Sequence, residues 1–158
     1  MKKLVECVPN ISEGNDQSVI NKIVETVKKY PGVKLLNVDP GKATNRTVIT
    51  FVGDADIIVD AAFKLISKAK ELIDMSKHIG EHPRMGAVDV CPLIPISGIS
   101  MQETVDLAHK LSERVGNELS IPVYCYEYAA KEDIRKNLAN CRAGEYEGLE
   151  NKFKDSLW

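Results

Sequence analysis

The chain has 158 residues, of which 44% are hydrophobic and 28% are charged, and its formal net charge is −2. A chain of this length typically forms one domain that buries roughly 70% of the surface its unfolded form exposes, and the composition is not that of a disordered segment. The pI of about 5.9 excludes an overall positive field. We therefore expect no nucleic-acid and no membrane partner, and small-molecule substrates are favoured.

The N-terminus carries Lys2 and Lys3, but Glu6 interrupts the short apolar run after them, so no signal peptide is expected. No apolar run reaches the ~20 residues that span a bilayer. The sequence therefore predicts a cytoplasmic protein. Its four cysteines are widely spaced and form no CxxC pair, which favours buried, reduced thiols.

The first elements alternate between apolar runs and turn residues. Residues 4–8 read as a strand that ends at Pro9, and a loop at 9–15 follows. From Asp16, apolar residues recur at helical spacing until Pro31, which predicts an amphipathic helix. Its apolar positions are Ile20, Ile23, Val24 and Val27.

Two further strands are predicted at residues 33–38 and 47–52, because both runs are rich in apolar and β-branched residues. The polar loop between them, residues 39–45, makes a hairpin plausible. After the second strand, Asp54 is placed to cap a long helix whose broad apolar face extends to Ile73.

Residues 87–96 read as a fourth strand, in which two prolines indicate an edge position or an early end. The order βαββαβ predicts an α+β fold, an α/β sandwich with a ferredoxin-like core. Ser100 and Glu103 form a capping box for an extra helix, residues 122–126 predict a fifth strand, and a helical tail follows from Lys131. The basic residues of this tail are expected on a solvated face: Arg135, Lys136, Arg142 and Lys152.

The densest polar cluster is the segment SKHIGEHPRMG at residues 76–86, between the long helix and the fourth strand. The imidazole of His82 exchanges protons near neutral pH, which suits a general base. Pro83 keeps His82 out of helical backbone angles, and Gly80 and Gly86 allow a close approach of the backbone to a substrate. The ordinary alternative is a solvated loop histidine.

A metal site at His78, Glu81 and His82 is disfavoured by the residue order. HIGEH differs from the HExxH of zinc helices, and Gly80 and Pro83 oppose a continuous helix. We therefore expect no metal.

Two other polar loops are candidate binding segments. In the stretch 39–47, Arg46 could clamp a carboxylate, and Asp39 could orient a histidine ring or a substrate nitrogen. Loop 9–15, which includes Asn10, precedes a helix N-terminus, a position that favours anions. The alternatives are an ordinary turn for the first loop and helix capping for the second.

Together these loops resemble a known family. The segments LVECVPNISEG, NVDPGKATNRTVITFVG, HIGEHPRMGAVDVCPLIPI and RKNLANCRAGEYEGL are similar to the N-terminal half of glutamate formiminotransferase, and the similarity spans nearly the whole chain. The stretch GEHPRMGAVDVCP is long and idiosyncratic, so it is far more specific than a lone glycine motif. The resemblance implies that residues 1–158 form a formiminotransferase N-terminal subdomain, as in formimidoyltransferase-cyclodeaminases.

The resemblance implies a cytoplasmic transferase of histidine degradation and one-carbon metabolism. Such an enzyme moves the formimino group from N-formimino-L-glutamate to N5 of its co-substrate tetrahydrofolate, and the resemblance makes His82 the general acid and base. From loop placement, Asp39 is expected to orient the ring of His82. The expected substrate-binding residues are Asn10, Arg46, Glu81 and Arg84.

The family's transferase unit resembles two similar halves whose sheets face each other across a folate tunnel. Because this chain stops at Trp158, we expect a C-terminal subdomain or a second copy of the chain to complete the folate site. A non-catalytic folate-binding or assembly module is the main alternative. An RNA-binding domain shares the βαββαβ topology, but Phe51 alone and a pI near 5.9 do not supply its aromatic and basic surface.

Overall fold

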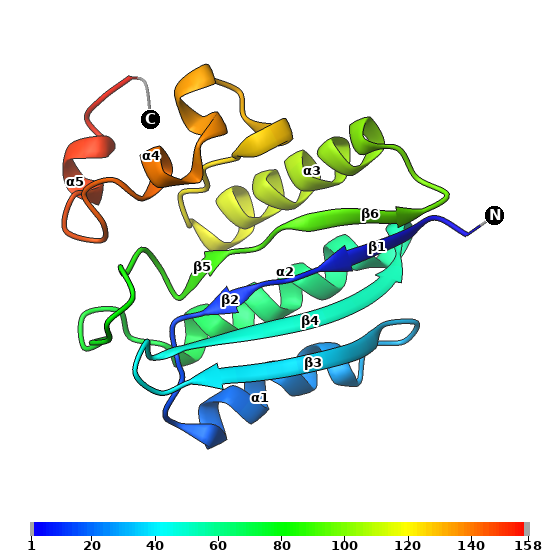
Figure 1. Cartoon of the computed structure of the whole chain (residues 1–158), viewed down its shortest axis with the longest axis horizontal. Helices are drawn as coiled ribbons and strands as arrows, with labels where there is room; N and C mark the ends of the chain where they lie inside the picture. Colours follow the sequence, from blue (N-terminus) through cyan, green and yellow to red (C-terminus); the bar gives the residue numbers. More distant parts are fainter. Residues whose placement is uncertain (1, 157–158) are drawn as a thin grey trace.

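The computed structural model describes residues 2–156, which form a mixed helix and sheet structure, and the α+β prediction is confirmed (Figure 1). The strands are β1 (Leu4–Cys7), β2 (Asn10–Ile11), β3 (Lys34–Gly41), β4 (Arg46–Asp54), β5 (Val88–Val90) and β6 (Leu93–Ser97). The longer helices are α1 (Gln17–Lys28), α2 (Ala55–Leu72) and α3 (Met101–Leu119). The C-terminal segment holds the short helices η1 (Glu127–Ala129), η2 (Asp133–Lys136), α4 (Leu138–Arg142) and α5 (Leu149–Lys152).

All six strands belong to one antiparallel sheet of order β5-β2-β4-β1-β6, with β3 on the other side of β4. The strand predicted at residues 87–96 is broken into β5 and β6, and the short strand β2 lies in the stretch predicted as a loop. Pro9 separates β1 from β2, and Pro92 separates β5 from β6. Proline has no backbone N–H to donate to a neighbouring strand, so the pairing is interrupted at both places.

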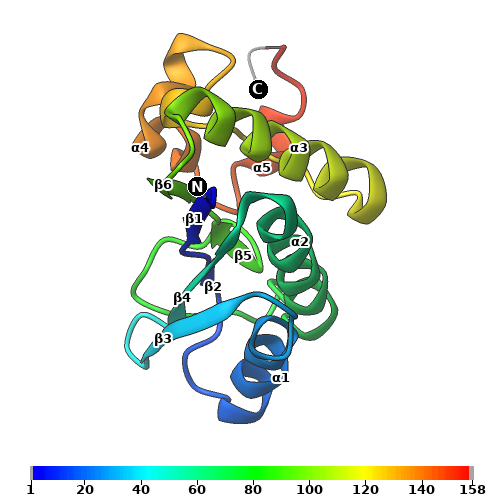
Figure 2. The same ribbon diagram turned by 90° about the vertical axis from the view of Figure 1, so that its right-hand side faces the viewer.

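Alternate residues of the strands define two faces of the sheet. On β4, Thr47, Ile49 and Phe51 are fully buried, while the residues between them are half-buried. Helices α1 and α2 lie on the side of the buried residues, which we call the covered face (Figure 2). The opposite side, which we call the open face, carries Arg46, Val48, Thr50 and Val52 of β4.

The helix starts follow their predicted caps with one exception. Asp16 accepts hydrogen bonds from two backbone N–H groups of α1, and the capping box of Ser100 and Glu103 at α3 is confirmed. Asp54 occupies the N-cap position of α2, but its side chain makes no capping bond there. It pairs instead with the ammonium of Lys2 at 3.4 Å, so the predicted position of the cap is confirmed but its capping hydrogen bond is not formed.

The predicted fifth strand at residues 122–126 is absent, because this stretch runs beside α3 rather than beside a sheet edge. There, Nε2 of His109 lies 2.9 Å from the carbonyl oxygen of Ala129. A helix offers no free ladder of backbone groups with which a strand could pair. The rest of the segment alternates between short helices and turns, so the predicted helical tail is confirmed only in part, and it packs over the β5 end of the sheet (Figure 1).

The expected solvated face of the tail is wrong for two of its basic residues. Lys152 is buried, and its ammonium donates to the carbonyl oxygen of Cys141 at 2.5 Å. Burial lowers the pKa of Lys152. Arg142 reaches the carboxylate of Asp89 at 2.6 Å. Both residues therefore fix the tail in place rather than face solvent.

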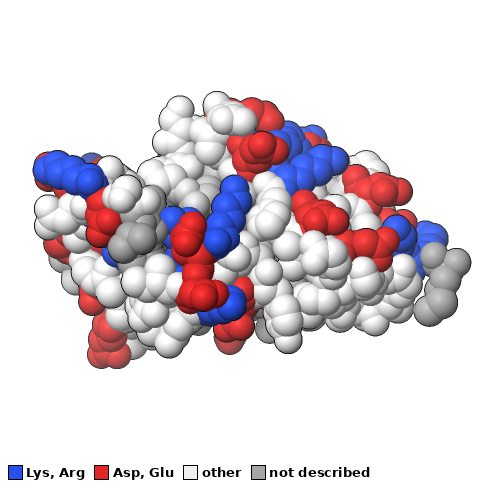
Figure 3. All heavy atoms as spheres, turned by 90° about the horizontal axis from the view of Figure 1, so that it is seen from above, with Lys and Arg blue, Asp and Glu red and all other residues white. Residues whose placement is uncertain are grey.

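Two surface properties bear on the class of partner. No helix within residues 2–156 is both long and apolar enough to cross a membrane. On the face seen in Figure 3, basic and acidic side chains alternate with uncharged stretches, so no large basic patch forms there. That mixture agrees with the small negative net charge.

Candidate active site

Asn45 joins the three polar loops at one end of the sheet. Its Oδ1 accepts a hydrogen bond from the backbone N–H of Gly14 at 2.9 Å, and its Nδ2 donates to the carbonyl oxygen of Ile79 at 2.9 Å. The residue has a φ of 48°, a left-handed conformation that asparagine tolerates better than most residues. Sequence reasoning missed Asn45, although an asparagine in a tight turn was a usable signal.

The loop between α2 and β5 is anchored by the residues that immediately precede His82. The backbone N–H of Glu81 donates to the carbonyl oxygen of Ala43 at 3.1 Å, and Nε2 of the buried His78 lies 2.9 Å from the carbonyl oxygen of Asn45. A Cβ at Gly80 would lie only 2.4 Å from the carbonyl oxygen of Thr44. Glycine therefore permits the close contact that holds this loop against the β3–β4 turn.

The half-buried ring of His82 lies between two groups with opposite hydrogen-bonding roles. Nδ1 is 2.7 Å from the carbonyl oxygen of Pro83, which can only accept a hydrogen bond. Nη1 of Arg46, which can only donate, lies against both ring nitrogens and closer to Nε2. One neutral tautomer satisfies both contacts: Nδ1 carries the proton, and Nε2 presents its lone pair.

Arg46 connects His82 to two other polar side chains. Its Nε donates to Oδ1 of Asn10 at 3.0 Å, and its Nη1 is 2.6 Å from Oδ2 of Asp89. The side chain of Arg46 is 13% exposed and that of Asp89 only 2%. Burial lowers the pKa of the Arg46 guanidinium, and the charge of Asp89 partly offsets this effect.

Asp89 and Arg142 complete the cluster, and sequence reasoning assigned neither of them to the site. Arg142 reaches Asp89 from α4 with two contacts, Nη2 to Oδ2 at 2.6 Å and Nε to Oδ1 at 3.3 Å. An acid within the apolar strand Val88–Val90 was a signal for Asp89, because a buried carboxylate needs partners. No local pattern singles out Arg142.

The other predicted site residues lie further from the ring of His82. Asp39, on β3, pairs with Val48 and is exposed on the open face, and no hydrogen bond or ion pair within residues 2–156 joins it to His82. Glu81 is exposed beside His82. Arg84 donates to Glu147 through Nε at 2.9 Å and to the carbonyl oxygen of Met75, so it ties the loop to the C-terminal segment.

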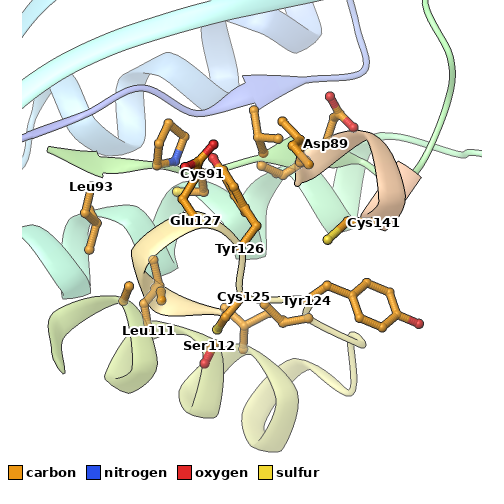
Figure 4. Close-up of a pocket in the computed structure, with 18 of the residues that line it drawn as sticks. Asp89, Cys91, Leu93, Leu111, Ser112, Tyr124, Cys125, Tyr126, Glu127 and Cys141 are labelled. Atoms are coloured by element: carbon orange, nitrogen blue, oxygen red, sulfur yellow. The ribbon is translucent and has the colours of Figure 1, made fainter. Parts of the chain in front are cut away.

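A cavity of about 570 Å³ lies between β5, β6, α3 and the C-terminal segment, and the ring of His82 is not part of its wall. Figure 4 shows Cys91, Tyr126 and Cys141 around this space. Burial raises the pKa of Tyr126 to about 12 and also raises that of the Cys141 thiol. Within residues 2–156, no three His, Cys, Asp or Glu side chains are grouped so that they could hold a metal ion.

Known proteins are similar in sequence to this chain over all or nearly all of its length. The profile of the family "Formiminotransferase domain, N-terminal subdomain" matches residues 4–158. The chain is 52% identical over 158 residues to the formimidoyltransferase-cyclodeaminase of Mus musculus, of which it covers 29%. It is 49% identical over 158 residues to the glutamate formimidoyltransferase of Streptococcus pyogenes serotype M1 and 47% identical over 157 residues to that of Thermoplasma acidophilum, covering 53% and 52% of them. The chain therefore spans about half the length of the second kind of relative and less than a third of the first.

Proposed function

Because the chain belongs to the formiminotransferase family as its N-terminal subdomain, we propose that it is the His82-bearing half of a glutamate formimidoyltransferase. The proposed reaction transfers the formimino group of N-formimino-L-glutamate to N5 of tetrahydrofolate and releases glutamate. One observation carries the proposal: anchored loops hold the His82 ring beside Arg46 and Asn10 at the end of the open face.

In the proposed mechanism, N5 of tetrahydrofolate attacks the amidine carbon and a tetrahedral intermediate forms. His82 accepts the proton of the attacking amine at Nε2, after the amine has displaced Nη1 of Arg46 from the lone pair of that nitrogen. It then delivers a proton to the glutamate nitrogen as the bond from that nitrogen to the amidine carbon breaks. Such proton transfer supplies ~10²–10⁴-fold in rate, and positioning of the two substrates supplies the rest.

The substrate-binding roles follow from where the polar groups lie. Within residues 2–156, the contacts of Arg46 with Asn10, Asp89 and His82 use Nε and Nη1, so Nη2 is the donor proposed for a substrate carboxylate. Asp39 and Asn10 flank Val48 on neighbouring strands of the open face. We assign Asp39 to the substrate amidine rather than to the orientation of the His82 ring. Glu81 and Arg84, from the loop that holds His82, are proposed as further contacts with the substrates.

A second half completes the proposed site over the open face. Ile94 and Ile96 of β6 are 38% and 52% exposed, and Ile94 pairs with Glu6, which in turn pairs with Val52 of the open face. Exposed apolar side chains on one sheet face favour contact with another subdomain or a second copy of the chain. We further propose a ferredoxin-like core for the paired strands and a cytoplasmic location.

The alternative is a folate-binding or assembly module in which His82 is idle. The test mixes the chain with the C-terminal half of the Streptococcus pyogenes relative and measures glutamate release from N-formimino-L-glutamate and tetrahydrofolate. Release by the mixture, with none from either half alone, supports the proposal. Binding of a reduced-folate analogue by the mixture without glutamate release supports the alternative.

A further inference from the structure

The geometry points to Asp89 as the positioning residue of the His82 ring, acting through Arg46 and held in place by Arg142. This inference rests on the proposed role of His82 and extends it to residues that do not touch the ring. Helix α4 of the C-terminal segment is thereby connected to Nε2 of His82. The contacts run from Arg142 to Asp89, from Asp89 to Arg46 and from Arg46 to His82.

The burial of Asp89 makes it the fixed point of this chain. Its side chain is 2% exposed, and both of its oxygens are engaged by Arg142. Oδ2 also lies 2.6 Å from Nη1 of Arg46. A buried carboxylate between two guanidinium groups is expensive to leave unpaired, so the three side chains keep one arrangement.

Arg46 needs such a fixed point because its flexible side chain must present one nitrogen to His82. Its Nε is already directed at Asn10 by a 3.0 Å hydrogen bond. With Nε on Asn10 and Nη1 on Asp89, the planar guanidinium has a single orientation, and that orientation brings Nη1 to the ring. This donor at Nε2 favours, together with the carbonyl oxygen of Pro83 at Nδ1, the His82 tautomer with an unprotonated Nε2.

Asp39 provides a matched comparison, since it is the aspartate that the sequence suggested as the ring orienter. Asp39 lies exposed on β3, whereas Asp89 is buried and contacts Arg46 directly. Asp39→Asn and Asp89→Asn make the same chemical change at the two positions. Only the second removes the charge that holds Arg46.

The experiment records long-range ¹⁵N–¹H spectra of the ¹⁵N-histidine-labelled 158-residue chain in alkaline buffer, where the imidazole is neutral. The chain has three histidines, and loss of one signal set in His82→Gln assigns the ring. We expect the wild type and Asp39→Asn to show a protonated Nδ1 and an unprotonated Nε2. Asp89→Asn is expected to show a mixture of both tautomers.

Two results would overturn the inference: a wild-type ring protonated on Nε2, or an Asp89→Asn ring that keeps the wild-type tautomer. Should Asp89→Asn fail to fold, Arg46→Lys serves as the second variant. Lysine keeps the positive charge but cannot reach Asn10, Asp89 and His82 together, so a mixture of both tautomers is again expected. An unchanged tautomer in Arg46→Lys would overturn the inference equally. These readings need no transfer activity, so they stand or fall separately from the glutamate-release assay.

Discussion

The covered face and the open face of the sheet alternate along the same strands, but their neighbours differ. On the covered face, Ile49 and Phe51 are fully buried against α1 and α2, and apolar contact is the main interaction there. On the open face, Arg46 is held by Asn10, Asp89 and His82 through directed polar contacts. The apolar contacts of the covered face stabilise the fold, and the polar contacts of the open face orient the imidazole ring of His82.

This difference shows that a single strand contributes alternate residues to the core and to the candidate site. Neighbouring residues of β4, such as Val48 and Ile49, point to opposite faces and so belong to different parts of the molecule. Changes on the open face near His82 should affect chemistry while the chain stays folded. Changes on the covered face should affect folding first. The following predictions test that separation, from the largest effect to the smallest.

Replacing His82 with Ala in the completed enzyme should give the largest effect. We expect glutamate release to fall ~10²–10⁴-fold, because the proton acceptor and donor is lost. The free energy of unfolding should change by no more than about 0.5 kcal/mol, since the half-buried ring adds little packing. Urea titration provides that control. Near-normal turnover in a folded His82→Ala enzyme would refute the assigned role.

Ile49→Ala should show the reverse pattern. The side chain is fully buried on the covered face, so its truncation should lower the free energy of unfolding by about 2–5 kcal/mol. The matched change Val48→Ala, one residue earlier on the open face, should cost less than about 1 kcal/mol, because a half-exposed side chain loses less buried area. Equal costs in urea titrations would contradict the division into two faces.

Local sequence patterns were enough to predict most of the covered face. The helical spacing after Asp16 and the capping box at Ser100 each depend on residues close in the chain, and both are as expected. The strand predicted at 122–126 failed because a strand also needs a free neighbouring edge, which local sequence does not reveal.

The open-face site was only half predictable. The loop of His82 and the turn of Arg46 carry unusual polar sequences, so they were recognised as candidates. The contact between Asp89 and Arg142 joins residues 53 positions apart, and nothing near Arg142 distinguishes it from a solvated arginine. Long-range polar pairing of this kind is set by the packing of the C-terminal segment, which the sequence pattern does not encode locally.

Ser100→Ala tests the N-terminus of α3, where Ser100 is the N-cap residue. Its hydroxyl accepts a hydrogen bond from the backbone N–H of Glu103 at 3.2 Å. Loss of this cap should lower the free energy of unfolding by about 1 kcal/mol, less than the loss of a core side chain. Ser100→Asp keeps a capping acceptor and serves as the control in the same urea titration. A cost for Ser100→Ala as large as that of Ile49→Ala would contradict the ranking.

The smallest effect should come from the pH-dependent contribution of Glu103, at the start of α3, to the free energy of unfolding. Hydrogen bonds from Lys3 and from the backbone N–H of Ser100 lower the pKa of Glu103 from 4.5 to about 2. Because the folded pKa lies below the unfolded one, this carboxylate stabilises the fold above pH 4.5 and loses that effect as the pH falls toward 2.

The comparison of wild type with Glu103→Gln isolates this contribution. The urea midpoint of the wild type should exceed that of Glu103→Gln at neutral pH, and the gap should close as the pH falls through the range between the two pKa values. High salt should narrow the gap, because both charged partners are exposed to solvent. A gap that widens in acid would mean that the Glu103 carboxylate opposes folding, and the lowered pKa would then be wrong.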